Sequence, residues 1–487
     1  MRKPSFLLAC SVAVALFGQG VARAENLLEV YQAAVKNDPV IREADARRMA
    51  SLEAKPQARA LLLPQVSVGG QIYTANSDGE STFPQVNQTT GDIVTVGNPS
   101  STDVKQYWDY SAELTQTVFR WDQWQALKRA DSQVAVAEAN YRAAQQDLLV
   151  RVSQAYFDVL AAEDTLSAAD ASLQAYTRQL EQAEKRFEVG LIAITDVQEA
   201  RAAHDSATAS LIAAKRALAS SNEALREITG DTYATLVKPA DDMPLDQPQP
   251  LDQDGWVKKA LDDNLGVIAA RLDSEVAATN VKIAEAGHLP TVDLFANYGE
   301  TDRQATQTNQ AFDPSGTLGG TGDKVKGSAD SNTTSDVIGL RVNIPVFAGG
   351  GTRSKVREQV YLQRAAREKL EGTMRSAERQ TRDAYLGVIA EKARVQALQQ
   401  SVKSNQTALE ATEAGFEVGT RTTVDVLDAR RRLFETQRDY ARSRYDYLIN
   451  IVKLKSAAGS LAPADLGSIN GFLTQPMTVP EVTKPAG

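Results

Sequence analysis

The sequence predicts an α+β membrane protein made of two tandem repeats, each with two strands and one long helical hairpin. Three observations predict this class: an internal duplication, two long intervals without proline, and four short segments of alternating hydrophobicity. A length of 487 residues would ordinarily suggest two or three compact domains. The helix lengths expected here argue against compact domains.

Residues 1–24 have the features of a secretory signal peptide. A basic start precedes an apolar run, and Ala22-Arg23-Ala24 forms a small-x-small cleavage site before Glu25. The only cysteine, Cys10, lies within this segment. We therefore expect a mature chain that starts at Glu25 and carries neither thiols nor lipid.

The mature chain is acidic. Without the three basic residues of the signal peptide, the chain has 50 Lys and Arg residues and 62 Asp and Glu residues, which gives a net charge of −12. This balance argues against nucleic acid as a partner. No stretch of about 18 apolar residues follows the signal peptide, which argues against a membrane-spanning helix. Any membrane segment would then consist of strands in a closed barrel.

Three segments of the first half of the chain recur in the second half. They pair Leu63–Val66 with Leu289–Val292, Val118–Phe119 with Val346–Phe347, and Phe187–Gly190 with Phe416–Gly419. The offsets of 226, 228 and 229 residues are nearly constant, which indicates a tandem duplication. We expect the repeats at 25–240 and 256–470. A Pro-rich linker at 241–255 joins them, and a Pro/Thr-rich tail at 471–487 is expected to be disordered.

Both repeats contain a long interval of high helix propensity. No proline occurs between Pro99 and Pro239 or between Pro345 and Pro463. From Val134 to Phe187, apolar or small residues recur at alternating steps of three and four with one 4-4 step, which is typical of a coiled-coil seam with a local stutter. A long helix in an ordinary bundle is the alternative. A helix of about 68 residues would, however, be ~100 Å long, far beyond a globular diameter.

Each long helix is expected to end at a glycine, Gly190 in the first repeat and Gly419 in the second. A returning helix follows each of these turns. The two helical hairpins are predicted at about 122–229 and 352–456, and they should point the same way because the repeats are equivalent.

Strands are predicted where the hydrophobic period changes to two. They are expected at about 65–74, 108–119, 291–299 and 336–347, each long enough for a tilted membrane-crossing strand. Polar segments between the strands, Asn76–Lys105 and Thr301–Thr334, predict long external loops. Soluble β-hairpins are the alternative. Because the smallest single-chain barrels have about eight strands, four strands can close a barrel only if several chains share it.

Four aromatic residues lie near a predicted strand. They are Trp108, Tyr110, Trp121 and Trp124. They could form a membrane-interface girdle or pack where strands and helices join.

These segments together resemble the TolC family of outer-membrane efflux and type I secretion channels. The resemblance runs from Glu25 to about Gly471 and is carried by Glu25–Gln32, Arg186–Gln198, Gly287–Pro290 and, most specifically, Val418–Ala429. It implies a homotrimer in which each chain gives four strands to one 12-stranded barrel, continued by a 12-helix tunnel. It also implies an outer-membrane location that extends into the periplasm, within outer-membrane lipid.

The resemblance further implies export without catalysis or a cofactor. A periplasmic adaptor (membrane fusion) protein and an inner-membrane transporter of the RND or ABC type would be the partners. Drugs, small toxic compounds or proteins would be the cargo. Opening would occur by untwisting of the helical hairpins at the periplasmic end.

By resemblance, Asp425 and Asp428 match the family's periplasmic aperture ring. Two aspartates three apart share one helix face, and three copies would surround a pore with negative charge. An Asp pair near a helix start can, alternatively, be just a favourable partner of the helix dipole.

The same resemblance places Arg421, Asp196, Thr195 and Phe416 at the gate lock, where Arg421 would hold the hairpins shut by bonding Asp196. A solvated surface charge is the alternative for Arg421. The family usually has a tyrosine where this chain has Phe416, so the closed state should depend more on Arg421 and on ring packing.

Two other function classes are alternatives for this sequence. A periplasmic coiled-coil adaptor or scaffold would share the helices and the signal peptide but lack the strands. A hydrolase using Asp425 and Asp428 lacks a Gly-rich loop or nucleophile motif. The two histidines, His204 and His288, are far from any ligand cluster in sequence, so no metal site is expected.

Overall fold

The computed structural model describes residues 25–86, 90–240, 243–310 and 324–479. The predicted signal peptide with Cys10, and the end of the predicted tail, lie outside these residues. The chain divides into two compact units, one made of Met1–Arg48, Ala137–Ala270 and Leu370–Gly487, the other of Met49–Val136 and Arg271–Lys369. Among the described residues, no helix combines the length and the apolar character that a membrane crossing requires.

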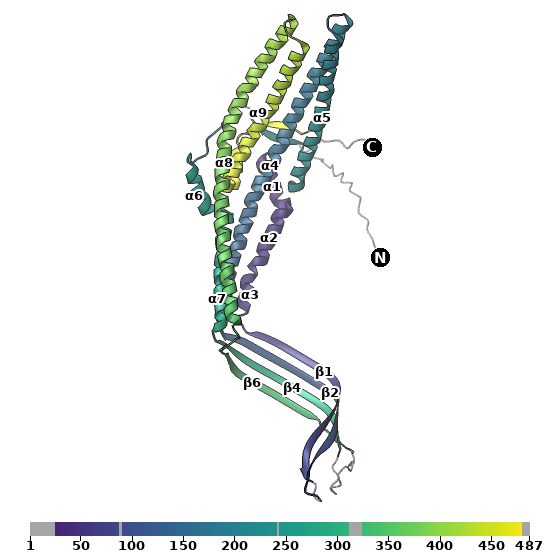
Figure 1. Cartoon of the computed structure of the whole chain (residues 1–487), viewed down its shortest axis with the longest axis vertical. Helices are drawn as coiled ribbons and strands as arrows, with labels where there is room; N and C mark the ends of the chain where they lie inside the picture. The colour runs from purple at the N-terminus through teal and green to yellow at the C-terminus, as the bar shows by residue number, and fades with distance from the viewer. Residues whose placement is uncertain (1–24, 87–89, 241–242, 311–323, 480–487) are drawn as a thin grey trace, which may run out of the picture. The chain divides into compact units, whose positions relative to one another are not determined.

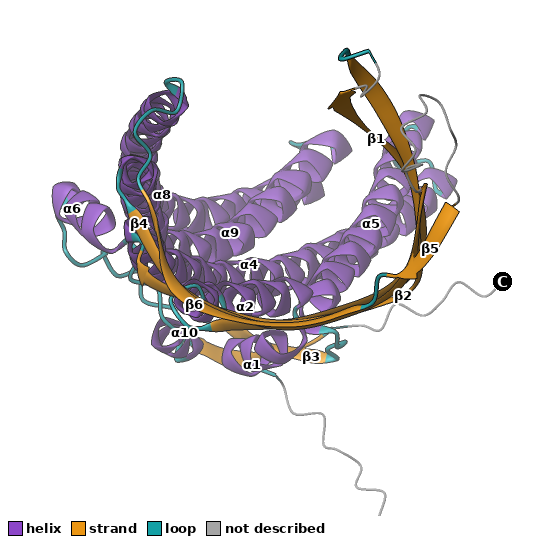
Figure 2. Ribbon diagram, turned by 90° about the horizontal axis from the view of Figure 1, so that it is seen from below, coloured by secondary structure: helices purple, strands orange, loops and turns teal. Residues whose placement is uncertain are grey.

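The first unit contains most of two helical hairpins, visible in Figure 1. One joins α4 (Trp121–Glu188) to α5 (Ile194–Thr229), and the other joins α8 (Gly351–Glu417) to α9 (Thr423–Ala457). Seen end-on in Figure 2, these helices follow an arc. The hydrophobic period and the absence of proline therefore located both hairpins to within a few residues.

The core of this unit lies where shorter elements pack on the hairpins. These elements are α1 (Leu27–Asn37), α2 (Pro39–Leu52), α6 (Gln253–Asp263) and α10 (Pro463–Asn470), whereas most of α7 (Leu265–Glu285) belongs to the second unit. Tyr156 and Phe157 of α4 and Tyr445 of α9 are almost completely buried, and Phe157 packs against both tyrosine rings. The sequence prediction did not include these short helices. α6 begins at Gln253, inside the expected linker.

A small sheet pairs two segments that are far apart in the chain. β3 (Thr235–Pro239) pairs antiparallel with β7 (Leu473–Thr478). The hydroxyl group of Tyr156 donates to the carbonyl of Val237 at 2.6 Å and thereby ties this sheet to α4. The expectation of a disordered tail from 471 was therefore wrong for its first residues, because Leu473 is buried and its backbone is paired.

The second unit contains a curved antiparallel sheet (Figure 2). Its strands are β1 (Gln65–Val86), β2 (Ile93–Phe119), β4 (Thr291–Gln310), β5 (Lys324–Ser328) and β6 (Ser331–Asn343). The order is β1–β2–β4, with both β5 and β6 paired to β4. α3 (Ala54–Ala60) and the short helix η1 (Ala286–His288) precede β1 and β4. The pairing of β2 with β4 joins residues 100–119 to residues 292–309.

Several strand boundaries differ from the prediction. β4 extends to Gln310 instead of 299, β6 begins at Ser331 instead of 336, and β5 was not predicted. Two further differences have a clear physical reason. First, β1 and β2 pair continuously to Val86 and Ile93, so much of the expected external loop is strand, as polar side chains do not prevent backbone pairing. Second, β6 ends at Asn343 instead of 347, because Pro345 has no amide hydrogen to donate. Val346 and Phe347, expected in the strand, lie beyond it and are exposed.

Candidate functional site at the hairpin tips

Both hairpins turn through the same backbone motif. The amide of Gly419 donates to the carbonyl of Phe416 at 3.1 Å, and the amide of Thr420 donates to Gly415 at 2.9 Å. The equivalent bonds in the first hairpin, from Gly190 and Leu191, are both 2.9 Å. The two glycines have φ of 74° and 79° and open space around them, so each is required for its left-handed backbone conformation.

Asp425 lies in the first turn of α9 and forms a capping box with Thr422. Its amide donates to the Thr422 hydroxyl at 3.2 Å, and its carboxylate accepts from the Thr422 amide at 2.9 Å and the Thr422 hydroxyl at 3.0 Å. These bonds to Thr422, with a contribution from the charge of Arg421, lower the pKa of Asp425. The carboxylate is thus a helix cap that stays ionised at neutral pH.

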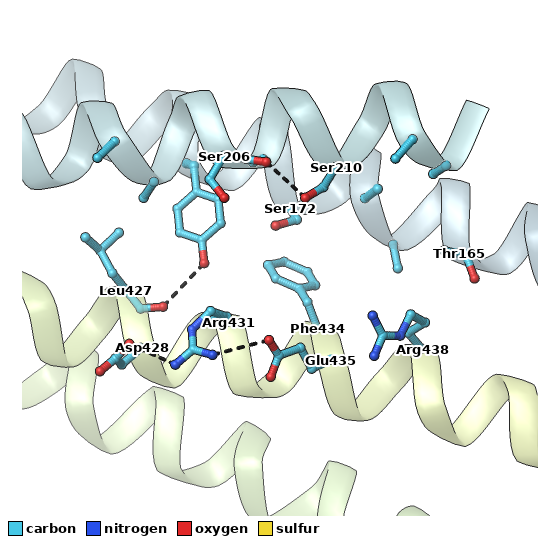
Figure 3. A pocket seen from close by; sticks show the side chains of 18 of the residues that line it. Thr165, Ser172, Ser206, Ser210, Leu427, Asp428, Arg431, Phe434, Glu435 and Arg438 are labelled. Atoms are coloured by element: carbon cyan, nitrogen blue, oxygen red, sulfur yellow. Dashed lines mark hydrogen bonds and ion pairs between the residues drawn. The ribbon is translucent and has the colours of Figure 1, made fainter. Parts of the chain in front are cut away.

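Asp428 lies one turn further along α9 and has a different partner. Arg431 donates to the Asp428 carboxylate at 3.2 Å and to Glu435 at 3.3 Å. These side chains border a groove of about 830 Å³ formed by α4, α5 and α9 (Figure 3). The opposite wall carries small residues, among them Ser172, Ser206 and Ser210.

Two hydrogen bonds link α4 and α9 near Asp428. The hydroxyl of Tyr176 donates to the carbonyl of Leu427 at 3.3 Å, and Arg430 donates to the carbonyl of Ala175 at 3.2 Å. Arg430 also forms an ion pair with Glu413 of α8. One guanidinium group therefore contacts both hairpins.

The predicted gate-lock residues lie at two tips, with Thr195 and Asp196 in the first turn of α5 and with Phe416 and Arg421 on either side of Gly419. Among the residues that the structure describes, no hydrogen bond or ion pair joins Arg421 to Asp196 or Thr195. Arg421 lies across its own tip, where a Cβ at position 415 would be 2.8 Å from its Cγ.

Phe416 is contacted by a residue that the sequence prediction did not include. The guanidinium carbon of Arg186 lies 5.0 Å from the centroid of the Phe416 ring, a cation–π contact between the last turns of α4 and α8. Arg186 belongs to the recurring segment before Gly190, but nothing in that pattern indicates its partner. The described residues contain no group of His, Cys, Asp and Glu that could hold a metal ion.

A family model and full-length relatives match this chain. The model described as outer membrane efflux protein matches residues 30–231 and 256–460. Outer membrane protein TolC of Escherichia coli K12 is 35% identical over 482 residues, covering 98% of this chain and 92% of that protein. TolC of Vibrio cholerae is 34% identical over 452 residues and covers 92% of this chain and 94% of its own.

A solved structure and a further relative agree with this family. The outer membrane protein VceC of Vibrio cholerae has a TM-score of 0.67 at 23% identity, covering 89% of this chain and 96% of that chain, and supports the fold alone. The alkaline protease secretion protein AprF of Pseudomonas aeruginosa is 27% identical over 457 residues, covering 91% of this chain and 86% of that protein. These matches are transport proteins rather than enzymes.

The resemblance seen in the sequence is thus confirmed over nearly the whole chain, and the periplasmic scaffold alternative is not favoured. The chain belongs to the outer membrane efflux protein family and is an outer-membrane efflux and secretion duct that extends into the periplasm.

Proposed function

We propose that this duct is a homotrimer. Each chain contributes its long strands to one 12-stranded barrel in outer-membrane lipid, and its two hairpins to a 12-helix tunnel. The two matched segments of the family model support the tandem repeats from which this arrangement is built.

The observation that carries the proposal is the open sheet of a single chain. β1 and β6 pair on one side only, so each leaves a row of backbone donors and acceptors. Exposed edges of this kind are not tolerated in a bilayer. The sheet also exposes apolar side chains, among them Val66 and Val68 of β1 and Ile338 and Leu340 of β6. Pairing β1 of one chain with β6 of the next would satisfy both edges and form a closed, lipid-facing surface.

Engineered cysteine pairs test this arrangement. The mature chain is expected to lack thiols, so Val68→Cys can be combined with single cysteines at successive positions from Val337 to Val342. At least one pair should give a disulfide-linked ladder that ends at three chains in oxidised outer-membrane fractions. Each single-cysteine variant is the control. If only monomers with an internal cross-link form, β1 pairs with β6 of the same chain and the shared barrel is wrong.

We further propose that the duct works with a periplasmic adaptor and an inner-membrane transporter of the RND or ABC type. Its cargo would include drugs, small toxic compounds and proteins, since its relatives include both an efflux protein, BepC, and the protease secretion protein AprF. Deleting the chain should abolish drug efflux and protein secretion together. Loss of only one of the two would restrict the cargo to that class.

Asp425 and Asp428 are proposed to surround the periplasmic aperture, and Arg421, Asp196, Thr195 and Phe416 to hold it closed until the hairpins untwist. Because no bond joins Arg421 to Asp196 within the described part of one chain, Arg421 would act on a neighbouring chain or at its own tip. Arg421→Gln should raise the conductance of trimers in planar bilayers. Unchanged conductance would remove Arg421 from the lock.

A further inference from the structure

One face of α9 carries charges of alternating sign. Asp428, Arg431, Glu435 and Arg438 all line the same groove, at steps of three, four and three residues (Figure 3). Such spacing keeps side chains on one side of a helix. If Asp428 faces the aperture, as proposed above, Arg431 is on the same side and about one turn away.

The guanidinium group of Arg431 contacts two carboxylates. Its guanidinium group donates to Asp428 at 3.2 Å and to Glu435 at 3.3 Å, and the hydrogen bond to Asp428 together with the charge of Glu435 raises the pKa of Arg431. The side chains of Arg431 and Asp428 are 55% and 48% exposed. A pair this exposed adds little to stability, but its charges act directly on ions in the adjacent water.

The two predicted aperture aspartates therefore differ in their electrostatics. Asp425 is held by hydrogen bonds from the uncharged Thr422. The charge of Arg421 also acts on Asp425, but no ion pair joins these two side chains among the described residues. Asp428 has a cation within hydrogen-bond distance. Since charges are screened only beyond ~10 Å at 0.1 M salt, a passing ion experiences Asp428 and Arg431 together. The pair then acts as a dipole instead of a full negative charge.

We propose that Arg431 is a selectivity-determining residue of the duct mouth. It offsets Asp428, so that a trimer presents about half of the negative charge that two aspartates per chain would give. The duct then admits anionic cargo more readily than a mouth with two uncompensated carboxylate rings. This inference rests on the proposed placement of Asp425 and Asp428 at the aperture.

Reversal potentials of purified trimers in planar bilayers, under a KCl gradient, test the proposal. Arg431→Gln should raise the K⁺ over Cl⁻ permeability ratio about twofold or more, because three positive charges are lost beside the pore. Arg431→Lys keeps the charge and should behave as the unaltered protein. Arg226→Gln is the matched control. Arg226 also pairs with an acid three residues earlier, Glu223, at 3.2 Å, but this pair lies near the C-terminus of α5, far from the hairpin tip.

The double variant with Asp428→Asn separates the possible failures. The double variant loses one negative and one positive charge per chain. Its cation preference should therefore not exceed that of the unaltered protein. If Asp425→Asn and Asp428→Asn lower cation preference but Arg431→Gln does nothing, the role of Arg431 is wrong and the aperture stands. If neither aspartate variant changes the ratio, the aperture placement is wrong and the inference fails with it.

Discussion

At the scale of single residues, Arg430 and Arg201 occupy matching positions of the two recurring sequence segments but make different contacts. Arg201 pairs with Glu184 at 2.9 Å, and Arg430 pairs with the equivalent acid, Glu413. Both pairs join the two helices of one hairpin. Only Arg430 also donates to the other hairpin, at Ala175, and its side chain is only 17% exposed. Both hairpins thus contain the same ion pair, and only the arginine of the second hairpin also contacts the other hairpin.

This difference predicts unequal effects of matched substitutions. Arg430→Gln should destabilise the contact between α4 and α9 by about 1–2 kcal/mol, because it removes charge-assisted hydrogen bonds. Trimers with this change should open more often and show higher conductance in planar bilayers. Arg201→Gln, which affects one hairpin only, should leave the conductance unchanged. Equal effects of the two substitutions would contradict a role of Arg430 between the hairpins.

At the scale of elements, Asp38 connects α1 and α2 to α4. Its carboxylate accepts from Arg151 of α4 at 2.8 Å and from the amide of Ile41 at 3.0 Å, and the side chain is 2% exposed. Burial acts to raise the pKa of Asp38, but the hydrogen bonds from Arg151 and Ile41 and the charge of Arg151 outweigh it, so that the pKa is lowered. This ion pair therefore stabilises the junction only while Asp38 is ionised.

The lowered pKa of Asp38 sets a direction for the pH dependence. Because the pKa of Asp38 is lower in the folded state, its carboxylate stabilises the fold at pH values above 3.8, its ordinary pKa. This stabilisation is lost as the pH falls through the lower pKa of the folded state. Asp38→Asn should reduce the free energy of unfolding by about 2 kcal/mol at pH 7, with a smaller difference below pH 3.8. Thermal unfolding followed by circular dichroism measures this. Asp147→Asn, at a 60% exposed partner of Arg151, should have little effect at either pH.

The pairing of β3 with β7 makes part of the C-terminal segment structural. A chain that ends at Asn470 loses this strand and the buried side chains of Leu473 and Val479. Its unfolding free energy should fall by about 3 kcal/mol or more. A chain that ends at Val479 keeps every described contact and should unfold at the same temperature as the full chain. Equal stability of both truncations would show that β7 contributes nothing.

At the scale of the whole molecule, stability should depend on association of chains. The sheet of one chain leaves two unpaired edges, so a folded monomer would have unsatisfied backbone groups in lipid. We expect outer-membrane extracts to contain trimers that withstand sodium dodecyl sulfate until heated. A species that migrates as a monomer without heating, although its helix content is native, would contradict the proposed trimer.

Much of the fold could be predicted because it depends on local properties. The boundaries of α4, α5, α8 and α9 followed from the hydrophobic period, the absence of proline and the glycine turns, which occur in both halves of the sequence. β1, β2 and β4 were placed but made too short, because their polar side chains hid the backbone pairing, and β5 was not predicted. The candidate aspartates came from family resemblance, since their spacing alone also fits helix caps.

By itself, the sequence determined the helical hairpins, their glycine turns and the alternating strands, because helix and turn formation depend on residues a few positions apart. Only the tertiary structure decided that Arg186 lies over Phe416, that Arg430 reaches Ala175, and that Leu473 is buried in a strand. Arg430 and Ala175 are 255 residues apart in sequence. Such pairs meet only when whole hairpins pack, and no local pattern in the chain records which side chains will then face each other.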